Sequence, residues 1–166
     1  MFTSMNNAVF LLLGTNLGNL GDNLAAAIHH IGERVGKIVR VSSHYRTAAW
    51  GKTDQPEFCN QVIEVETFSS PEEVLTQVLA IETLLGRERK EKWGERLIDI
   101  DILYYGDRAV HSPGLIIPHP QLQNRRFTLV PLCEIAPDFV HPVLHKTNSE
   151  LLEQCPDQLA VHKVEE

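Results

Sequence analysis

Two aspartates separated by a single residue are the side chains whose type and spacing indicate chemistry most directly. Asp99 and Asp101 lie in segment 97–105, where side chains alternate with a period of two. This alternation predicts a β-strand, so both carboxylates are expected on one face, roughly 6.5–7 Å apart at their Cα atoms. Two carboxylates at that separation can hold one or two hard cations, so the pair resembles a magnesium site.

The alternative is a pair of solvated acids on the exposed face of a half-buried strand. Acidic residues are depleted in strands, and neighbouring carboxylates repel each other unless a cation neutralises them. Five of the fifteen Lys and Arg residues fall within ten positions just upstream: Arg87, Arg89, Lys90, Lys92 and Arg96. A local cationic patch in an acidic protein suggests a small anionic ligand beside the aspartates.

A second stretch, 46–60, combines aromatic and polar side chains in what is expected to be a long loop between two strands. Long loops in compact domains often carry function. Trp50 and Phe58 suggest a platform for a ligand; alternatively, they close the edge of the core. Further along the chain, Glu82 borders the apolar stripe of a predicted helix, one turn before the arginines, and is expected to point into a site.

Local patterns predict the elements that must position these residues. Strands are predicted at 8–13, 37–45, 61–67 and 97–105. Helices are predicted over 20–35, 70–85, 124–136 and 149–154, with caps at Asn19 or Asp22, at Ser70 with Glu73, and at Thr147 or Asn148. The alternation in the strand that carries the aspartates predicts that Tyr104 lies on the same face as Ile100, and that Tyr105 lies on the face of the two acids. The proline-rich segment 115–120 is expected to be a loop, and the chain beyond Pro156 is expected to be frayed.

Composition limits the class of protein. The 166 residues suit a single domain, with its core at about 8–154 and an acidic tail. A net charge of −7 argues against binding to nucleic acid. The apolar run 8–13 is too short for a membrane span, and no targeting segment is visible. Three cysteines without a C-x-x-C spacing indicate reduced thiols, so a cytoplasmic protein is expected. A monomer is expected as well.

The order of these signals resembles the 6-hydroxymethyl-7,8-dihydropterin pyrophosphokinase family of folate biosynthesis, from about Phe10 to Leu152. The most specific match is the segment that begins at Lys92 and continues through Gly94, Arg96, Asp99, Asp101 and Leu103. Supporting matches lie in the segments 13–18, 45–47, 55–60, 86–89, 118–119 and 124–127. The resemblance implies a ferredoxin-like α/β sandwich, a mainly antiparallel sheet with helices on its faces.

The resemblance also implies the reaction and its residues. ATP, as co-substrate, would transfer its β,γ-pyrophosphoryl group to the pterin hydroxymethyl oxygen and release AMP. Asp99 and Asp101 would hold two Mg²⁺ ions, with Arg87 and Arg96 as further catalytic residues. ATP would contact Glu82, Arg87, Arg89, Arg96, Ile102, His119 and Arg125. The pterin would contact Thr47, Trp50, Phe58, Asn60 and Phe127, and the two phenylalanines would stack on its faces.

Two departures from the family pattern bear on this transfer. The charged loop 87–93 is one residue shorter than in some relatives, which leaves the roles of Glu88, Arg89 and Lys90 open, and Thr15 stands where serine is common. No general base is identifiable. The alternatives are a magnesium-dependent phosphohydrolase or nucleotidyltransferase, which would not need the aromatic pair or Asn60, and a non-catalytic ferredoxin-like binding module.

Overall fold

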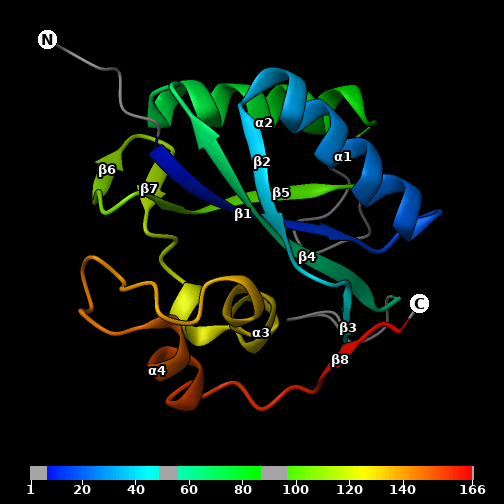
Figure 1. Ribbon diagram of the computed structural model, residues 1–166. Helices are drawn as coiled ribbons and strands as arrows, with labels where there is room; N and C mark the ends of the chain where they lie inside the picture. Colours follow the sequence, from blue (N-terminus) through cyan, green and yellow to red (C-terminus); the bar gives the residue numbers. More distant parts are fainter. Residues whose placement is uncertain (1–6, 49–55, 87–96, 166) are drawn as a thin grey trace, which may run out of the picture.

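The protein is built on one mainly antiparallel sheet, shown in Figure 1 as a computed structural model that describes residues 7–48, 56–86 and 97–165. The strand order is β5-β1-β4-β3-β8, and β2 also pairs with β4. The strands of this sheet are β1 (Asn7–Thr15), β2 (Lys37–Val41), β3 (Tyr45–Thr47), β4 (Phe58–Thr67), β5 (Asp99–Tyr105) and β8 (Val161–Lys163). The pairings between these strands are antiparallel. Because β5 is the first strand in this order, it forms one edge of the described sheet.

Helices cover both faces of this sheet (Figure 1). Helices α1 (Leu20–Arg34) and α2 (Pro71–Leu84) lie on one face, and α3 (Arg126–Ile135) and α4 (Asn148–Glu153) lie on the other. Between β5 and α3 the chain forms a small hairpin, β6 (Val110–Ser112) and β7 (Leu115–Ile117), and a 3-10 turn, Leu122–Asn124. This arrangement is the two-faced α/β sandwich that the sequence predicts.

The side chains of β1 alternate between two apolar cores, one on each face of the sheet. Leu11 and Leu13 pack in the core beneath α1 and α2. Phe10 and Leu12 pack in the core formed with α3 and α4. Because both faces of the central strand are buried, β1 is apolar at consecutive positions, as buried strands are. The strand that carries the aspartates is hydrogen-bonded to this buried strand, which fixes its position.

A β-bulge interrupts the alternation of β5. Phe10 pairs with Tyr104 but Leu11 pairs with Ile102, so Leu103 is an extra residue in β5. The predicted facing is therefore wrong for Tyr104 and Tyr105, whereas Leu103 lies on the face of the aspartates as predicted. Tyr104 packs with Leu103 in the core beside α3, and Tyr105 packs in the core beneath α1 and α2. The two aspartates precede the bulge, and their predicted common face is retained.

The predicted helix caps are confirmed, whereas the helix predicted from residue 124 begins at Arg126 as α3. The Asn19 side chain caps α1 by accepting a hydrogen bond from the backbone N–H of Asp22. Ser70 and Glu73 form a complete capping box at α2, and Thr147 caps α4. Helix α2 ends at Leu84, just before Gly86, which adopts a φ of +89°. These features depend on residues three or four positions apart, which is why the sequence reveals them.

Three predicted segments differ in the structure. Segment 115–120 is not all loop, because Leu115–Ile117 pairs with β6 as strand β7 and ends before Pro118. The chain beyond Pro156 is not frayed, because Val161–Lys163 pairs with β3 as strand β8. The predicted strand over 37–45 is divided into β2 and β3. In addition, β4 begins at Phe58 rather than 61, so Phe58 and Asn60 lie in a strand.

Candidate active site

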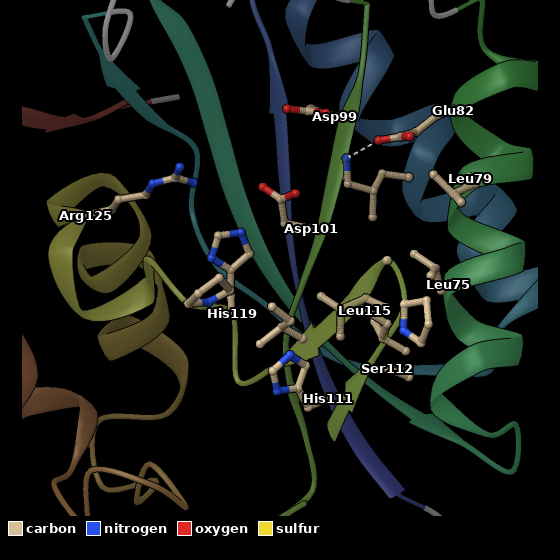
Figure 2. A pocket seen from close by; sticks show the side chains of 16 residues that line it. Leu75, Leu79, Glu82, Asp99, Asp101, His111, Ser112, Leu115, His119 and Arg125 are labelled. Carbon is tan, nitrogen blue, oxygen red and sulfur yellow. Dashed lines mark hydrogen bonds between the residues drawn. The ribbon is translucent and has the colours of Figure 1, made fainter. Parts of the chain in front are cut away.

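The larger of two adjoining cavities follows the open edge of β5 and has a volume of about 860 Å³. Leu75, Leu79 and Glu82 line it from α2, and residues of the β6–β7 hairpin line it from below (Figure 2). Asp99, Asp101, His119 and Arg125 complete the described lining on the side of α3. A volume of this size lies within the roughly 300–1,000 Å³ typical of small-molecule sites.

Backbone groups at the edge of β5 face this larger cavity. The N–H of Ile100 donates to Oε2 of Glu82 at 2.8 Å, so it points away from β1 (Figure 2). Because hydrogen-bonding groups alternate along an antiparallel strand, the backbone of Ile102 faces the same open edge. Beyond it, the carbonyl of Leu103 accepts a hydrogen bond from the N–H of His119 at 3.0 Å. Glu82 and His119 therefore frame a short stretch of strand edge.

The two aspartates lie at the junction of the cavities. In the sheet register Asp99 pairs with Gly14 and Asp101 pairs with Leu12. In Figure 2 both carboxylates project to the side on which Arg125 and His119 lie, whereas Glu82 approaches from α2 on the opposite side. Burial lowers the pKa of Arg125, while the charges of Asp101 and Asp99 raise it. Arg125 and the two aspartates therefore form one electrostatically coupled group.

His119 is held as a neutral imidazole with a defined tautomer. Its Nδ1 accepts a hydrogen bond from the backbone N–H of Gln121 at 3.1 Å, so the ring proton resides on Nε2. Burial and then the nearby charge of Arg125 lower the pKa of His119 to about 4, against a smaller opposing effect of Asp99. At neutral pH His119 is therefore a hydrogen-bond donor without a charge.

The smaller cavity has a volume of about 70 Å³ and lies on the α3 side of the sheet. Thr47, Phe58 and Asn60 line it from β3 and β4, and Arg125 and Phe127 line it from the start of α3. Asn60 is 3% exposed, and its Nδ2 has no hydrogen-bond partner among the described residues. A buried amide donor without a partner is costly unless a ligand supplies the acceptor.

Gly14 lets the backbone of β1 form the floor of this cavity between Asn60 and Asp99. It pairs with Asn60 on one side and with Asp99 on the other. A Cβ at this position would stand 2.8 Å from Oδ1 of Asn60, closer than real Cβ atoms approach. Glycine in a strand interior often marks such a close approach.

The structure brings most of the predicted site residues into these two linings. Asp99, Asp101 and Arg125 line both cavities; Glu82, Ile102 and His119 line the larger one; and Thr47, Phe58, Asn60 and Phe127 line the smaller one. Trp50, Arg87, Arg89 and Arg96 lie outside the described residues. The individual roles of all these residues remain predictions.

Other lining residues were not predicted as site residues. Leu12, Gly14 and Ala48 also line the smaller cavity. Residues 111–116 of the β6–β7 hairpin line the larger one. Two sequence signals point to them: a glycine that ends an otherwise apolar strand, and the Pro113-Gly114 dipeptide, which is typical of a turn.

Comparison with known proteins assigns the chain to a family. A sequence model of the 7,8-dihydro-6-hydroxymethylpterin-pyrophosphokinase (HPPK) family matches residues 10–137. The chain belongs to this family. Its relatives include the 2-amino-4-hydroxy-6-hydroxymethyldihydropteridine pyrophosphokinase of Synechocystis sp., which is 47% identical over 86% of this chain and 73% of the relative. The protein of the same name from Haemophilus influenzae is 38% identical over 93% of this chain and 94% of the relative.

Solved structures confirm the ferredoxin-like fold expected for the family. The crystal structure of Plasmodium falciparum HPPK-DHPS superposes with a TM-score of 0.75 at 20% sequence identity. The match covers 90% of this chain and 44% of that one, so the chain spans less than half of this solved relative. At this identity the likeness shows the fold alone. Within the described part of the chain, every helix is too short or too polar to traverse a lipid bilayer.

The donor set suits a hard divalent cation. Asp99 and Asp101 share one strand face and both line the two cavities. Among the described residues no group of three or more His, Cys, Asp or Glu side chains gathers as a metal site. Magnesium is typically held by one or two carboxylates together with substrate phosphates and water, rather than by a cage of protein ligands. Two half-buried aspartates beside a nucleotide-sized cavity fit that pattern.

Proposed function

We propose that the chain transfers the β,γ-pyrophosphoryl group of ATP to 6-hydroxymethyl-7,8-dihydropterin, with ATP in the larger cavity and the pterin in the smaller one. Its membership of the family and the names of its curated relatives support this reaction. The observation that supports the placement of the substrates is that Asp99, Asp101 and Arg125 line both cavities. The reacting groups of the two substrates would meet at that shared boundary.

The edge of β5 supports the placement of the nucleotide base. An adenine ring presents donors and acceptors along one edge, and the backbone groups of Ile102, which face the edge of the sheet, can pair with them as a further strand would. Leu75 and Leu79 supply apolar contact on the α2 side of the same cavity. The triphosphate would then extend toward Asp99 and Asp101, where Arg125 and His119 lie.

The smaller cavity has the features that a flat polar heterocycle requires. Phe58 and Phe127 offer aromatic faces, and stacking on such faces contributes apolar contact without demanding a particular edge. The unpartnered Nδ2 of Asn60 can donate to an acceptor on the edge of the pterin ring. Two aromatic rings together with a buried amide donor suit a planar ligand better than a flexible chain.

In the reaction the hydroxymethyl oxygen forms a bond to the β-phosphorus, the bond from that phosphorus to the α,β-bridging oxygen breaks, and AMP leaves. The hydroxyl proton is released to water in the same process. We propose that Asp99 and Asp101 hold two Mg²⁺ ions, which when bound neutralise and orient the phosphates. Arg125 adds a fixed positive charge, and the Nε2–H of neutral His119 donates a hydrogen bond to a phosphate oxygen. Positioning and charge neutralisation then account for most of the catalysis.

We further propose that the protein acts as a cytoplasmic monomer. The described linings of the two cavities include donors, acceptors and aromatic rings for both substrates, so the proposed reaction needs no side chain from a second copy. Cys59, Cys133 and Cys155 are free thiols, which suits a reducing compartment. Gel filtration with light scattering at several protein concentrations tests the first statement. An apparent mass close to 18.7 kDa is expected.

The reaction is tested by incubating the protein with MgATP and the pterin and following the phosphorus NMR spectrum. AMP together with a pterin diphosphate is expected. Release of ADP would instead indicate ordinary phosphoryl transfer, and turnover without pterin would indicate a phosphohydrolase. The variant Asp107→Asn, at an exposed turn after β5, serves as a control and should behave as the wild type.

A further inference from the structure

The segment that follows α4 contacts β3 and the first residue of α3, two elements that contribute to the lining of the smaller cavity. Strand β8 pairs with β3, where Val161 lies opposite Thr47, and the Thr47 hydroxyl donates to the carbonyl of Ala160 at 3.3 Å. A few residues earlier, Oδ2 of Asp157 accepts a hydrogen bond from the backbone N–H of Arg126 at 3.0 Å. Arg126 opens α3, the helix whose start contributes Arg125 and Phe127 to the cavity. Figure 1 shows this segment running from α4 to the edge of the sheet at β3.

Helix α3 needs an acceptor that its own first residues do not provide. The first N–H groups of any helix lack partners within the helix. In α3 the N-cap position is Arg125, whose side chain makes no capping hydrogen bond. A guanidinium carries only donors, so it cannot cap a helix, and this one lines both cavities. The residue that serves the site thus occupies the position at which a capping side chain would normally stand.

Asp157 supplies the missing acceptor from 31 residues away. Its negative charge also suits the positive end of the helix dipole. The other carboxylate oxygen, Oδ1, accepts a hydrogen bond from the backbone N–H of Leu159 at 3.0 Å. That second bond fixes the turn that leads into β8. A single carboxylate therefore joins the beginning of α3 to the beginning of the strand that pairs with β3.

We propose that Asp157 is a positioning residue for the pterin: by capping α3 from the C-terminal segment it holds Arg125 and Phe127 in place against the β3–β4 wall. The inference rests on the assignment of the smaller cavity to the pterin. Asp157 lies beyond residues 10–137, the part of the chain that the family model matches. The contact acts on the substrate only through Arg126, because Asp157 itself is absent from the described lining of either cavity.

The test is the variant Asp157→Ala, titrated with the pterin by ligand fluorescence. Loss of one helix cap typically shifts an equilibrium by about fivefold to tenfold, so the dissociation constant of the pterin should rise by about that factor. The constant for a non-hydrolysable ATP analogue should rise less, because Phe127 lines only the smaller cavity. In steady-state assays KM for the pterin should rise while kcat at saturating pterin is kept, since bound ligand restores the ordered first turn.

Two further variants and one local measurement make the test specific. Asp157→Asn keeps one acceptor oxygen and should fall between the wild type and Asp157→Ala. Asp138→Ala removes the same charge from an exposed position just beyond the C-terminal end of α3 and should bind the pterin normally. Hydrogen exchange of the amides at 126–129 should become faster in Asp157→Ala, while exchange in α1 stays unchanged.

The outcomes separate this inference from the cavity assignment. Phe58→Ala, measured in parallel, should weaken pterin binding whether or not Asp157 matters. If Phe58→Ala binds the pterin normally, the cavity assignment is wrong and the inference falls with it. If Phe58→Ala is impaired but Asp157→Ala is not, the inference alone is wrong. Equal losses of pterin and nucleotide affinity in Asp157→Ala, with a lower melting temperature, would show a purely structural role and overturn it as well.

Discussion

The carboxylate of Glu82 on α2 accepts a hydrogen bond from the backbone N–H of Ile100 on β5, with Oε2 2.8 Å from the nitrogen. Glu82 is only 3% exposed. Because β5 is an edge of the described sheet, this N–H has no strand partner, and the acid provides one. The same strand carries Asp99 and Asp101. A buried acid on a neighbouring helix thus fixes the strand edge that supports the candidate metal ligands.

Replacing Glu82 by alanine should therefore lower the free energy of unfolding by roughly 1.5–3 kcal/mol, the usual contribution of a hydrogen bond to a charged group. Glu82→Gln keeps an acceptor oxygen and should lose less. Urea denaturation measures both values. Glu72→Ala, on the exposed face of the same helix, should stay within about 0.5 kcal/mol of the wild type. An alanine variant at position 82 that is as stable as the wild type would contradict the structural part of this argument.

Asp99→Ala or Asp101→Ala should lower turnover by at least ~100-fold, about 2.7 kcal/mol of transition-state stabilisation. The fold should persist, because both side chains lie at the cavity junction rather than in either apolar core. Turnover at saturating magnesium, combined with circular dichroism, checks both statements. Asp107→Ala provides the matched control. Rates like those of the wild type in either site variant would rule out the proposed magnesium ligands.

Gly14→Ala should weaken pterin binding, because its Cβ would lie 2.8 Å from Oδ1 of Asn60 and displace that side chain. We expect the dissociation constant of the pterin to rise about tenfold, equivalent to about 1.4 kcal/mol, with a smaller change for the nucleotide. The control is Gly32→Ala in α1, whose Cβ would meet Ile38 at 3.7 Å, an ordinary contact. This control should gain about 0.5–1 kcal/mol of stability and bind normally. Unchanged pterin affinity in Gly14→Ala would mean that Asn60 does not contact the ligand.

Phe58 and Phe127 should each contribute on the order of 1–3 kcal/mol to pterin binding, by analogy with base stacking on aromatic side chains. They come from β4 and α3, on different walls of the smaller cavity. Titration of Phe58→Ala and Phe127→Ala with the pterin, in the presence of an unreactive ATP analogue, should show weaker pterin binding with nucleotide affinity nearly intact. Normal pterin binding with melting temperatures several degrees lower would show instead that these rings only fill the core.

Features that depend on residues close together in the chain are predicted from the sequence, whereas features that depend on residues far apart in the chain are not. The caps at Asn19 and Ser70 depend on residues within one helical turn, and both were predicted. The bulge at Leu103 arises from pairing with β1, about ninety positions away, and the alternating pattern gives no sign of it. Strand β8 was missed for the same reason, since its partner is β3.

In the candidate site, too, contacts between residues far apart in the chain could not be predicted. The resemblance to the family points to Asn60 and Phe127, and both line the smaller cavity. It did not reveal how α3 is capped, because the cap comes from Asp157, outside any local pattern at the helix. Gly14 was not predicted as a site residue, because its close approach to Asn60 depends on the register of two strands. The sequence shows which side chains could contact a ligand. The contacts that position those side chains become visible only in the folded protein.

His141 should make the stability of the protein depend on pH. Its side chain is buried, and its Nδ1 accepts hydrogen bonds from the backbone N–H groups of Val143 and Leu144, at 3.1 and 3.0 Å. These bonds require an unprotonated Nδ1. Burial, and then the neighbouring His145, lower the pKa of His141 below its usual value. Protonation would remove both acceptor contacts from the turn that follows Val140.

The direction of the change in the free energy of unfolding with pH depends on whether the folded or the unfolded protein binds more protons. Below about pH 6.5, the usual pKa of histidine, the unfolded chain binds a proton that the folded protein takes up only at lower pH. The free energy of unfolding should therefore fall as pH drops through this window and rise again toward pH 7. His119, whose pKa is also lowered, contributes in the same direction.

His141→Asn keeps an acceptor near the position of Nδ1 but cannot be protonated, so its stability should fall less between pH 7 and pH 5. Urea denaturation at the two pH values measures the difference, with His162→Gln on β8 as the exposed control. Equal losses of stability in His141→Asn and the wild type would show that His141 is not a source of the pH dependence.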